Sequence, residues 1–431
     1  MASKIIAGLD IGSSKIGTII AQFNLEDAKT SIIGVSSTPS AGIRKGQVVN
    51  IEEATTAIIS SVEAAERMAG YSVSKLLVSV GGAHIASQNS KGVVAVAEPE
   101  GEIGPEDVRR VIEAARAISL PSSREIIHCL PRYFTVDSQD GVKDPLGMNG
   151  IRLEVETHII SGSSTSIKNL SRCVSEVGAD IDSMVFSGIA SAQAVLTETE
   201  KELGVVLVDV GGGTTSLVIY IEGAPSYTSV LPIGAKNVTN DLAIGLRLSL
   251  ENAEKLKIAL SDKSIEKTLP DQSEKKEEKS NDELDLASLG INEDTKTVSR
   301  KTITEGIIKP RLNEIFTMVG LEIKKSGFAG MTPSGIVLTG GGALTVGAVD
   351  SCKRTLSMPV RIGIPTGLTG LVEDVLSPVF ATVLGLILYR SSIQKTETTK
   401  VSLINFERIT DKIPIGGLAH KAIDFIKSLL P

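Results

Sequence analysis

The sequence predicts an α/β protein made of two related domains. At 431 residues the chain is too long for a single ordinary core. Along most of it, short apolar stretches typical of strands alternate with longer stretches of helical periodicity. An apolar strand that ends in Asp and is followed by a glycine-rich turn occurs near residue 10 and again near residue 209. This loose internal duplication indicates two domains of similar design.

The first ninety residues predict the order strand, strand, strand, helix, strand. Each expected strand is an apolar or alternating run, and the helix has apolar residues at helical spacing and ends at Gly70. The strands are expected at Ile5–Asp10, Ile16–Phe23, Ser31–Ser37 and Lys75–Val80, and the helix at Ile51–Met68. Residues 86–161 interrupt this order and predict an inserted module, with a helix at Pro105–Ile118 between strands at Gly92–Ala97 and Arg124–Asp137.

After residue 161 the alternating pattern resumes. The expected elements are a helix at Ser163–Val177, a strand at Ile181–Phe186, a helix at Gly188–Leu196, a strand at Val205–Val210, a hairpin to residue 231, helices near 234–245, 249–260 and 302–326, a strand at Gly335–Leu338 and helices at 343–356 and Pro378–Tyr389. The segment from Ser261 to Asp285 is dense in Lys, Glu, Asp and Ser. It offers little to bury, so we expect it to be mobile.

The composition is that of a globular protein, with 42% hydrophobic and 22% charged residues. A net charge of -7 and 3% aromatic residues argue against nucleic acid as a partner. Cys129, Cys173 and Cys352 are scattered without metal-ligand spacing, which is typical of free thiols in a reducing compartment. The N-terminus lacks the pattern of a signal peptide, and no run of about 18 apolar residues predicts a membrane span.

The first glycine-rich turn follows the expected strand Ile5–Asp10. Its candidate binding residues are Gly12, Ser13, Ser14 and Lys15. Small residues let backbone N–H groups approach phosphate oxygens closely, and Lys15 adds a positive charge for them. Asp10, at the end of the strand, is a candidate to hold Mg²⁺ through water. An ordinary tight hairpin is the alternative for this turn.

The second and third turns repeat the theme. Asp209 ends an apolar strand and precedes a turn with the candidate binding residues Gly211, Gly212, Gly213, Thr214 and Thr215. Three consecutive glycines cost backbone entropy, which indicates a special demand on this turn. Gly340, Gly341 and Gly342 then link a strand to a helix and permit the close approach of a flat base and its ribose. None of the three turns has the spacing of a P-loop or a Rossmann fingerprint.

In this order, the three turns resemble the phosphate 1, phosphate 2 and adenosine motifs of the actin, Hsp70 and sugar-kinase superfamily. The resemblance covers roughly residues 5–390 and implies an actin-like, ribonuclease H-like fold whose two domains clamp ATP and Mg²⁺, with Asp10 and Asp209 framing the metal. The segment Ala253–Lys257 resembles the superfamily's adenosine-binding helix. It implies that Glu254 contacts the ribose and Lys257 the adenine.

Four further stretches resemble the FtsA family of bacterial cell division proteins. They are Lys45–Ile51, Gly82–Asn89, Leu196–Gly204 and Val360–Gly363. The resemblance implies subdomain 1A at 1–85, 162–197 and 358–390, an inserted subdomain 1C at 86–161, subdomain 2A at 198–233 and 304–357, and subdomain 2B at 234–303. A flexible linker at 391–412 and a terminal helix at 413–431 follow. The charged segment 261–285 departs from the compact 2B of the family.

What the FtsA resemblance implies is an ATP-binding adaptor that polymerises and anchors the ring of the tubulin-like protein FtsZ to the cytoplasmic membrane. The C-terminal peptide of FtsZ is commonly acidic, and Arg300 and Lys301 stand where the family has basic residues. Subdomain 1C is expected to recruit later divisome proteins. Gln193 lies at about the spacing of actin's water-positioning Gln, so it is the candidate catalytic residue of what is at most a weak ATPase.

The last residues, Gly417–Leu430, form an amphipathic helix when placed at 100° per residue. The candidate membrane-contacting residues are Leu418, Ala422, Phe425, Ile426, Leu429 and Leu430 on the apolar side, with Lys421 and Lys427 on the polar side. Docking on the protein's own core is one interpretation. The polar linker before the helix and the resemblance to FtsA, which ends in this way, favour a helix lying in the membrane interface.

Three other functions share the expected fold. A sugar kinase or exopolyphosphatase needs a base near the γ-phosphate, and no distinct motif supplies one. A PilM-like pilus assembly protein does not need a terminal membrane helix. An Hsp70-like chaperone needs a substrate-binding β domain, and none follows residue 390.

Overall fold

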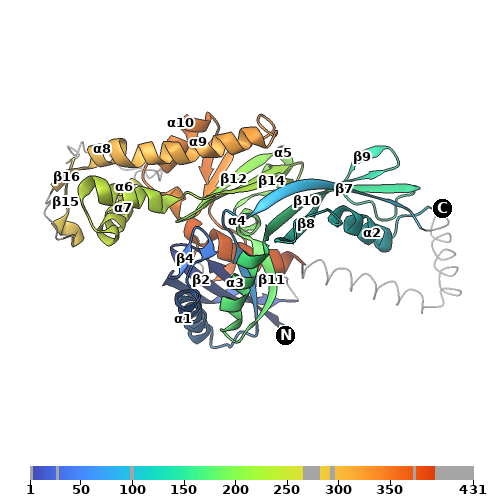
Figure 1. The fold of residues 1–431 in the computed structure, drawn as a ribbon, viewed down its shortest axis with the longest axis horizontal. Coiled ribbons are helices and arrows are strands. Elements are labelled where there is room, and N and C mark those ends of the chain that lie inside the picture. The colour runs from blue at the N-terminus through green and yellow to red at the C-terminus, as the bar shows by residue number, and fades with distance from the viewer. Residues whose placement is uncertain are drawn as a thin grey trace, which may run out of the picture.

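The computed structural model describes residues 3–25, 29–97, 101–265, 282–291, 297–371 and 375–393. Figure 1 shows two domains, each built on a sheet, and a smaller module to one side of them. The last described helix covers residues 381–393, so it runs three residues into the linker expected at 391–412. The rest of that linker and the terminal helix expected at 413–431 lie outside the described residues.

The first domain has a six-stranded sheet in the order β11-β6-β1-β2-β3-β19. Its strands are β1 (Ser3–Ile11), β2 (Lys15–Asn24), β3 (Thr30–Pro39), β6 (Lys75–Val80), β11 (Asp180–Phe186) and the short β19 (Thr369–Gly370). Strands β1 and β2 form an antiparallel hairpin, while β1 and β6 run parallel. The predicted Ile5–Asp10, Ile16–Phe23, Ser31–Ser37 and Lys75–Val80 strands are thereby confirmed.

Helices cover both faces of this sheet. On one face, α1 (Ile51–Ala69) and α3 (Ser164–Ser175) bury a shared apolar cluster. Helix α1 starts where the Asn50 side chain accepts the N–H of Glu53, and it ends as predicted at Gly70, which has the left-handed conformation. On the other face, α4 (Ser187–Val195) and the helix at 381–393 share one core with residues of both domain sheets. The two domains are therefore joined through common packing.

The second domain repeats the plan of the first. Its sheet has the order β14-β13-β12-β17-β18, with β12 (Val205–Val210), β13 (Thr215–Ile221), β14 (Ala224–Leu231), β17 (Ile336–Thr339) and β18 (Val360–Ile362). Strands β12 and β13 form an antiparallel hairpin, and β12 runs parallel to β17. The first three strands of each domain are therefore joined in the same way, which confirms the duplication.

The helices of the second domain share one buried core with its sheet. They are α6 (Ala235–Leu246), α7 (Leu250–Ile265), α8 (Arg300–Ile303), α9 (Lys309–Lys325) and α10 (Ala348–Leu356), with α8 and α9 joined by a π-helical turn at Thr304–Ile308. A small ladder, β15 (Glu283–Asp285) and β16 (Thr297–Ser299), lies beside them. Short elements elsewhere are β4 (Ile43–Arg44), β5 (Gln47–Val48), α5 (Glu198–Leu203) and 3-10 turns at Ala287–Leu289, Gly341–Leu344 and Pro378–Phe380.

The charged segment expected to be mobile between Ser261 and Asp285 belongs to regular structure at both ends. Helix α7 continues to Ile265, and within it the Ser261 hydroxyl donates to the carbonyl of Lys257 and accepts the N–H of Val346. Glu283–Asp285 pair with β16. Regular structure therefore extends into the predicted segment from both sides, and residues 266–281 lie outside the described residues.

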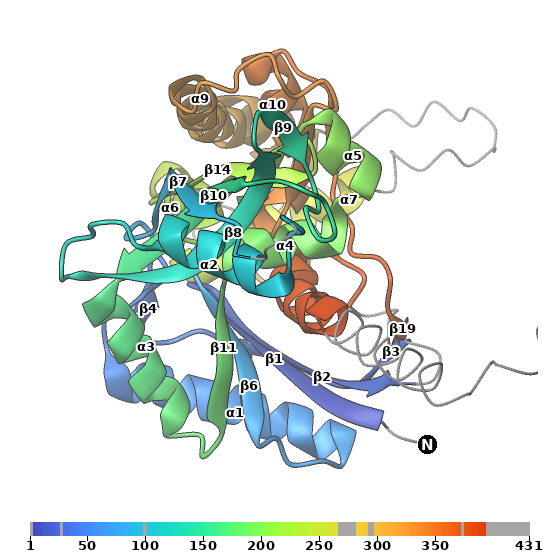
Figure 2. The same cartoon turned by 90° about the vertical axis from the view of Figure 1, so that its right-hand side faces the viewer.

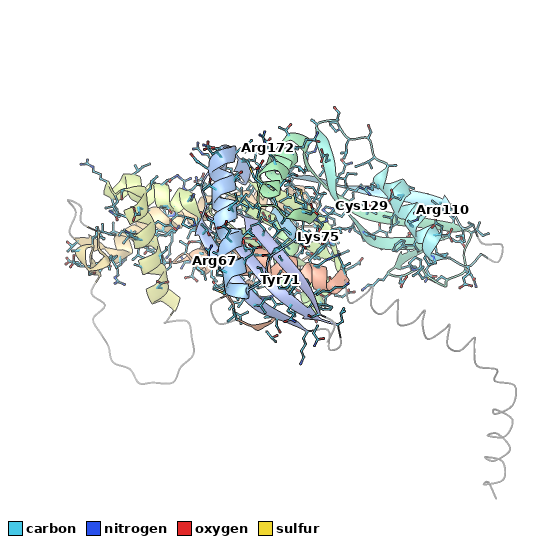
Figure 3. All side chains as sticks on the ribbon, turned by 90° about the horizontal axis from the view of Figure 1, so that it is seen from below. Arg67, Tyr71, Lys75, Arg110, Cys129 and Arg172 are labelled. Atoms are coloured by element: carbon cyan, nitrogen blue, oxygen red, sulfur yellow. The ribbon has the colours of Figure 1, made fainter. Side chains whose placement is uncertain are left out.

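The inserted module is a four-stranded sheet, β7-β10-β8-β9, with one helix packed on it. Its elements are β7 (Ala86–Ala95), α2 (Pro105–Arg116), β8 (Arg124–Val136), β9 (Gln139–Val142) and β10 (Arg152–Ser163). Buried Asp107 fixes the helix to the sheet, since it accepts the N–H of Ala97 and pairs with Arg110, which Figure 3 labels. Strand β10 is absent from the predicted elements, although Leu153 and Val155 alternate with charged residues and are buried.

This module also contacts the second domain, along the edge strand β14. Figure 2 shows β7, β8 and β10 close to β14 and above the first-domain strands β11 and β6. The hydroxyl of Ser87 donates to the carbonyl of Thr228 at 2.8 Å and accepts its N–H at 3.2 Å. Arg132 donates to the hydroxyl of Ser226 at 3.0 Å. Side chains of the module thus occupy backbone groups that an edge strand leaves open.

A buried histidine completes this contact. His158, on β10, is 1% exposed. Its ring nitrogens lie 2.7 Å from the Asn89 side-chain oxygen and 3.3 Å from the Thr228 hydroxyl. Burial lowers the pKa of His158 from 6.5 to about 3. The contact is therefore formed with a neutral imidazole.

Among the helices that the structure describes, none has both the length and the apolar character needed to cross a bilayer.

The depressed pKa of His158 predicts an acid-sensitive fold. In the unfolded chain this histidine binds a proton near pH 6.5, whereas in the folded chain it stays neutral until about pH 3. Its contribution to stability is therefore complete above pH 6.5 and is lost as the pH falls below that value. Between pH 7 and 5 the wild type is expected to lose about 2 kcal/mol more unfolding free energy than His158→Gln, as measured by urea denaturation. Parallel pH profiles for the two proteins would contradict this.

Candidate functional site

A cavity of about 520 Å³ lies where the two domains meet. Its walls come from the β1–β2 and β12–β13 hairpin turns, the turn after β17, and helix α7. All three predicted glycine-rich turns therefore contribute to one cavity, although they are separated by more than a hundred residues in the sequence. The predicted residues that line it are Asp10, Gly12, Ser13, Ser14, Lys15, Asp209, Gly211, Gly212, Thr214, Glu254, Lys257, Gly340, Gly341 and Gly342.

Close approach of the two hairpins accounts for their small residues. Each turn is closed by one backbone hydrogen bond, Gly12 N–H to Lys15 O at 3.0 Å and Gly211 N–H to Thr214 O at 2.9 Å. A Cβ on Gly212 would collide with the side chain of Ser14. The two turns touch each other across the domain boundary, so only glycine fits there.

Two residues of the second turn do not line the cavity. A Cβ on Gly213 would meet the Ser13 side chain at 2.8 Å, so this glycine serves contact between the hairpins. Thr215 is fully buried on β13, and its hydroxyl donates to the carbonyl of Ile233 at 2.9 Å. The interpretation of Gly213 and Thr215 as ligand contacts therefore has no support from their positions.

Two carboxylates face the cavity from the ends of the first strands of the two sheets. Asp10 accepts a hydrogen bond from the Ser79 hydroxyl at 2.7 Å, and Asp209 accepts one from the Ser191 hydroxyl at 2.6 Å. Burial raises the pKa of Asp10, and it raises the pKa of Asp209 to about 6 with a further contribution from the charge of Asp10. A bound divalent cation would reverse both shifts, and carboxylate oxygens are the ligands that Mg²⁺ prefers.

Lys15 places a buried positive charge in the same cavity. Its Nζ is buried without a hydrogen-bond partner among the described residues, and it lies 3.7 Å from the centre of the Phe380 ring. Burial lowers its pKa to about 8, although Asp10 and Asp209 both oppose that shift. An unpaired ammonium in a water-poor cavity is costly unless an anion joins it. Within the described part of the chain, Lys15 therefore lacks a hydrogen-bonding anion, and one lysine does not balance the two carboxylates Asp10 and Asp209. A polyphosphate would pair with the lysine and its Mg²⁺ with the carboxylates, so these residues fit both groups.

Helix α7 brings a paired set of side chains to the same cavity. The Lys257 ammonium lies 2.7 Å from the Glu254 carboxylate and 3.0 Å from the Thr239 hydroxyl. Ile258 lies beside them, half exposed in the cavity wall. Since the charge of Lys257 is already balanced, this part of the cavity offers hydrogen-bonding groups and an apolar wall, which suit a base and its sugar.

The turn after β17 packs tightly against the second carboxylate. Gly340 has φ +82°, and a Cβ there would collide with Asp209. A Cβ on Gly342 would collide with Val210. These two glycines let the turn lie flat against the end of β12.

Gln193 is not among the described residues that line the cavity. Ser191, two positions earlier in α4, faces Asp209, and two residues correspond to about 200° around a helix. Gln193 therefore points away from Asp209, and its role as a water-positioning residue stays a prediction. The α4 residue that lines the cavity is Ser187, whereas the fully buried Ser191 hydroxyl holds Asp209 and lies 3.0 Å from the hydroxyl of Thr382.

Other cavity residues were missed by the sequence pattern. Ser79 is the penultimate residue of β6, and the rule that ligands bind at the carboxyl ends of parallel strands would have found it. Lys236 is the second residue of α6, and no local signal separates it from other surface lysines. Thr382 comes from the last helix, which reaches the cavity only through folding.

The partner candidates lie elsewhere. Arg300 and Lys301 begin α8, where Asp282 accepts the N–H of Lys301 at 2.9 Å. Neither residue lines the cavity described above. The candidate membrane residues between Leu418 and Leu430 lie outside the described residues.

Comparison with known proteins identifies the family. A family model described as "Cell division protein FtsA" matches residues 206–385, and one described as "SHS2 domain inserted in FTSA" matches residues 82–161. A curated cell division protein FtsA from Borreliella burgdorferi is 42% identical over 402 residues, which cover 93% of this chain and 94% of that protein. The chain belongs to the FtsA family. The FtsA proteins of Pseudomonas aeruginosa and Escherichia coli are 37% and 32% identical over 90% of this chain, covering 89% and 90% of their own lengths.

Solved structures that resemble this FtsA-family chain share its fold. One from the PilM–PilN type IV pilus biogenesis complex has a TM-score of 0.61 at 17% identity, and covers 90% of this chain and 98% of its own. MreB5 of Spiroplasma citri bound to AMPPNP has a TM-score of 0.50 at 12% identity, with 92% and 99% coverage. The fold is actin-like, as predicted, and the module matched by the inserted-domain model of FtsA is the sheet β7-β10-β8-β9.

Because Gly340 packs against Asp209, we predict that Gly340→Ala lowers the unfolding free energy more than Gly330→Ala does. Gly340 and Gly330 both have positive φ, +82° and +84°, but a Cβ on Gly330 meets nothing within 4 Å. The positive φ alone is expected to cost about 1 kcal/mol at Gly330 and about 1–3 kcal/mol at Gly340, whose ψ of 166° lies in a region that glycine almost alone adopts. Gly340→Ala is expected to cost about 1–3 kcal/mol more, measured by urea denaturation without nucleotide. Equal losses of stability would show that the turn yields freely.

Proposed function

We propose that this chain binds ATP and Mg²⁺ between its two domains and acts as a peripheral membrane adaptor in bacterial cell division. The observation that carries the nucleotide half is the cavity in which unpaired Lys15 and the carboxylates Asp10 and Asp209 meet between two glycine-rich hairpins. Lys15 and the backbone N–H groups of the turns would hold the phosphates. Asp10 and Asp209 would hold Mg²⁺ through water, and Mg²⁺ supplies neutralisation of phosphate charge.

The remainder of the nucleotide would occupy the other part of the cavity. Glu254 and Lys257 provide hydrogen bonds for the ribose and the base, and the turn at Gly340 and Gly342 lies flat enough for close contact. The shared fold with AMPPNP-bound MreB5 supports this assignment. Asp209 is already hydrogen-bonded to the hydroxyls of Ser191 and Thr382, which limits its strength as a base for activating water. We therefore infer that any ATP turnover is slow and that ATP serves assembly.

The adaptor half rests on membership of the FtsA family. Its curated relatives are named cell division proteins. We propose that the chain anchors the FtsZ ring to the cytoplasmic face of the inner membrane at the division site, that it polymerises there, and that subdomain 1C recruits later divisome proteins. Weak membrane binding by one terminal helix would be strengthened by avidity along a filament. The PilM-like alternative has support in the shared fold alone.

The FtsZ contact predicts that charge reversal at the start of α8 weakens peptide binding. Arg300→Glu with Lys301→Glu is expected to lower capture of the FtsZ C-terminal peptide at least about tenfold in a pull-down, because that peptide is commonly acidic. The matched control reverses Lys353 and Arg354, two exposed cations of α10, and should bind like the wild type. If the wild type binds the peptide neither with nor without ATP, the adaptor function is wrong. If both variants bind equally, the contact lies elsewhere.

The proposed membrane helix predicts that lipid binding can be lost without loss of ATP binding. Deletion of residues 413–431 is expected to leave ATP binding intact and abolish co-sedimentation with anionic vesicles. Phe425→Asp, in the apolar arc, should act like the deletion, whereas the neighbouring polar-side change Asp424→Ala should bind vesicles normally. Full vesicle binding by the truncated chain would refute the membrane role of this segment.

A further inference from the structure

Lys236, the second residue of α6, is bonded to both glycine-rich hairpins at once. Its N–H donates to the carbonyl of Gly212 at 2.8 Å, which ties its backbone to the turn of the second domain. Its side chain crosses the domain boundary, where Nζ donates to the carbonyl of Ser13 at 2.6 Å. Both Lys236 and Ser13 line the cavity. One side chain therefore links the two turns that approach each other most closely.

The ammonium of Lys236 keeps capacity for an anion. A lysine ammonium has three N–H donors, and the bond to Ser13 uses one of them. Unlike Lys257, which pairs with Glu254, Lys236 has no carboxylate partner among the described residues. Lys15 reaches the same cavity from the first domain. Each domain therefore places one lysine without a carboxylate hydrogen-bond partner in the described structure at the hairpin turns, Lys15 from the first domain and Lys236 from the second.

The start of α6 itself has no N–H groups to spare for an anion. Ala235 donates to Gly211, Lys236 donates to Gly212, and Asn237 donates to Gly234. The dipole of a helix N-terminus favours negative charge, but direct hydrogen bonds need free donors. At this point of the cavity, the side chain of Lys236 is what remains to bind an anion.

We propose that Lys236 discriminates a nucleoside triphosphate from a diphosphate by binding the terminal phosphate. This inference rests on the proposed ATP binding and deepens it. The base-binding part of the cavity is marked by Lys257, whereas Lys236 stands at the two hairpin turns, where the last phosphate of the chain belongs. With a triphosphate present, the ammonium joins the domains through both Ser13 and the ligand. With a diphosphate, the Ser13 bond is the connection that remains.

The test compares ATP and ADP binding to the full-length chain in Mg²⁺, by equilibrium titration. Lys236→Ala is expected to weaken ATP about tenfold to a hundredfold, the usual contribution of a charge-assisted hydrogen bond, and to change ADP affinity less than about threefold. Lys236→Arg should restore part of the ATP preference because it keeps the charge. Lys255→Ala removes an exposed lysine of α7 that does not line the cavity, and it should leave both affinities unchanged.

The possible results separate this inference from the proposed function. If the wild type binds neither nucleotide, the proposed ATP site itself fails. If the wild type binds both and Lys236→Ala weakens both equally, Lys236 is a brace between the hairpins and the inference is overturned. Unchanged affinities for both also overturn it. A thermal unfolding scan without nucleotide confirms that each variant is folded before its affinities are compared.

Discussion

The structure depends on the burial of three charged groups, Asp10, Lys15 and Asp209, at one junction between two domains. Burial works against the charge of each, since it raises the pKa of both carboxylates and lowers that of the lysine. Their mutual attraction and the hydroxyls of Ser79 and Ser191 offset part of that cost. The remaining cost of burying these charges is one that a metal ion beside the carboxylates and a polyanion beside the lysine would together remove. The junction is therefore a place where ligand binding and domain closure share the same free energy.

Glycine at the turns is the geometric counterpart of this electrostatic constraint. The hairpins bring their carboxylates and Lys15 into one cavity only because Gly212 and Gly213 leave room for Ser14 and Ser13. Gly340 leaves room in the same way for Asp209. Each domain supplies a rigid strand hairpin, so a small change in the angle between the domains changes the cavity directly. The shape of the cavity is thus set by the relative position of the two domains.

The inserted module adds a third connection between the domains, beyond the shared core and the hairpins. It grows from the first domain, yet Ser87 and Arg132 hydrogen-bond β14 of the second. Rotation of one domain against the other must therefore move the module or break these bonds. The contact therefore links the position of the module to the angle between the two domains that form the cavity. Neutral His158, buried within the contact, shows how little water it admits.

The sequence by itself determined the fold class, the repeated strand–turn units and most residues of the glycine-rich turns that line the cavity. These features are local: an apolar strand, a terminal Asp and a run of glycines constrain their own backbone wherever they occur. The tertiary structure decided which side chains complete the site. The orientation of α4 about its axis turns Ser191, rather than Gln193, toward Asp209. Lys236 donates to the carbonyl of Ser13, which lies 223 positions earlier in the sequence. Contacts of this kind depend on how one domain is placed against the other, and no local pattern in the chain carries that information.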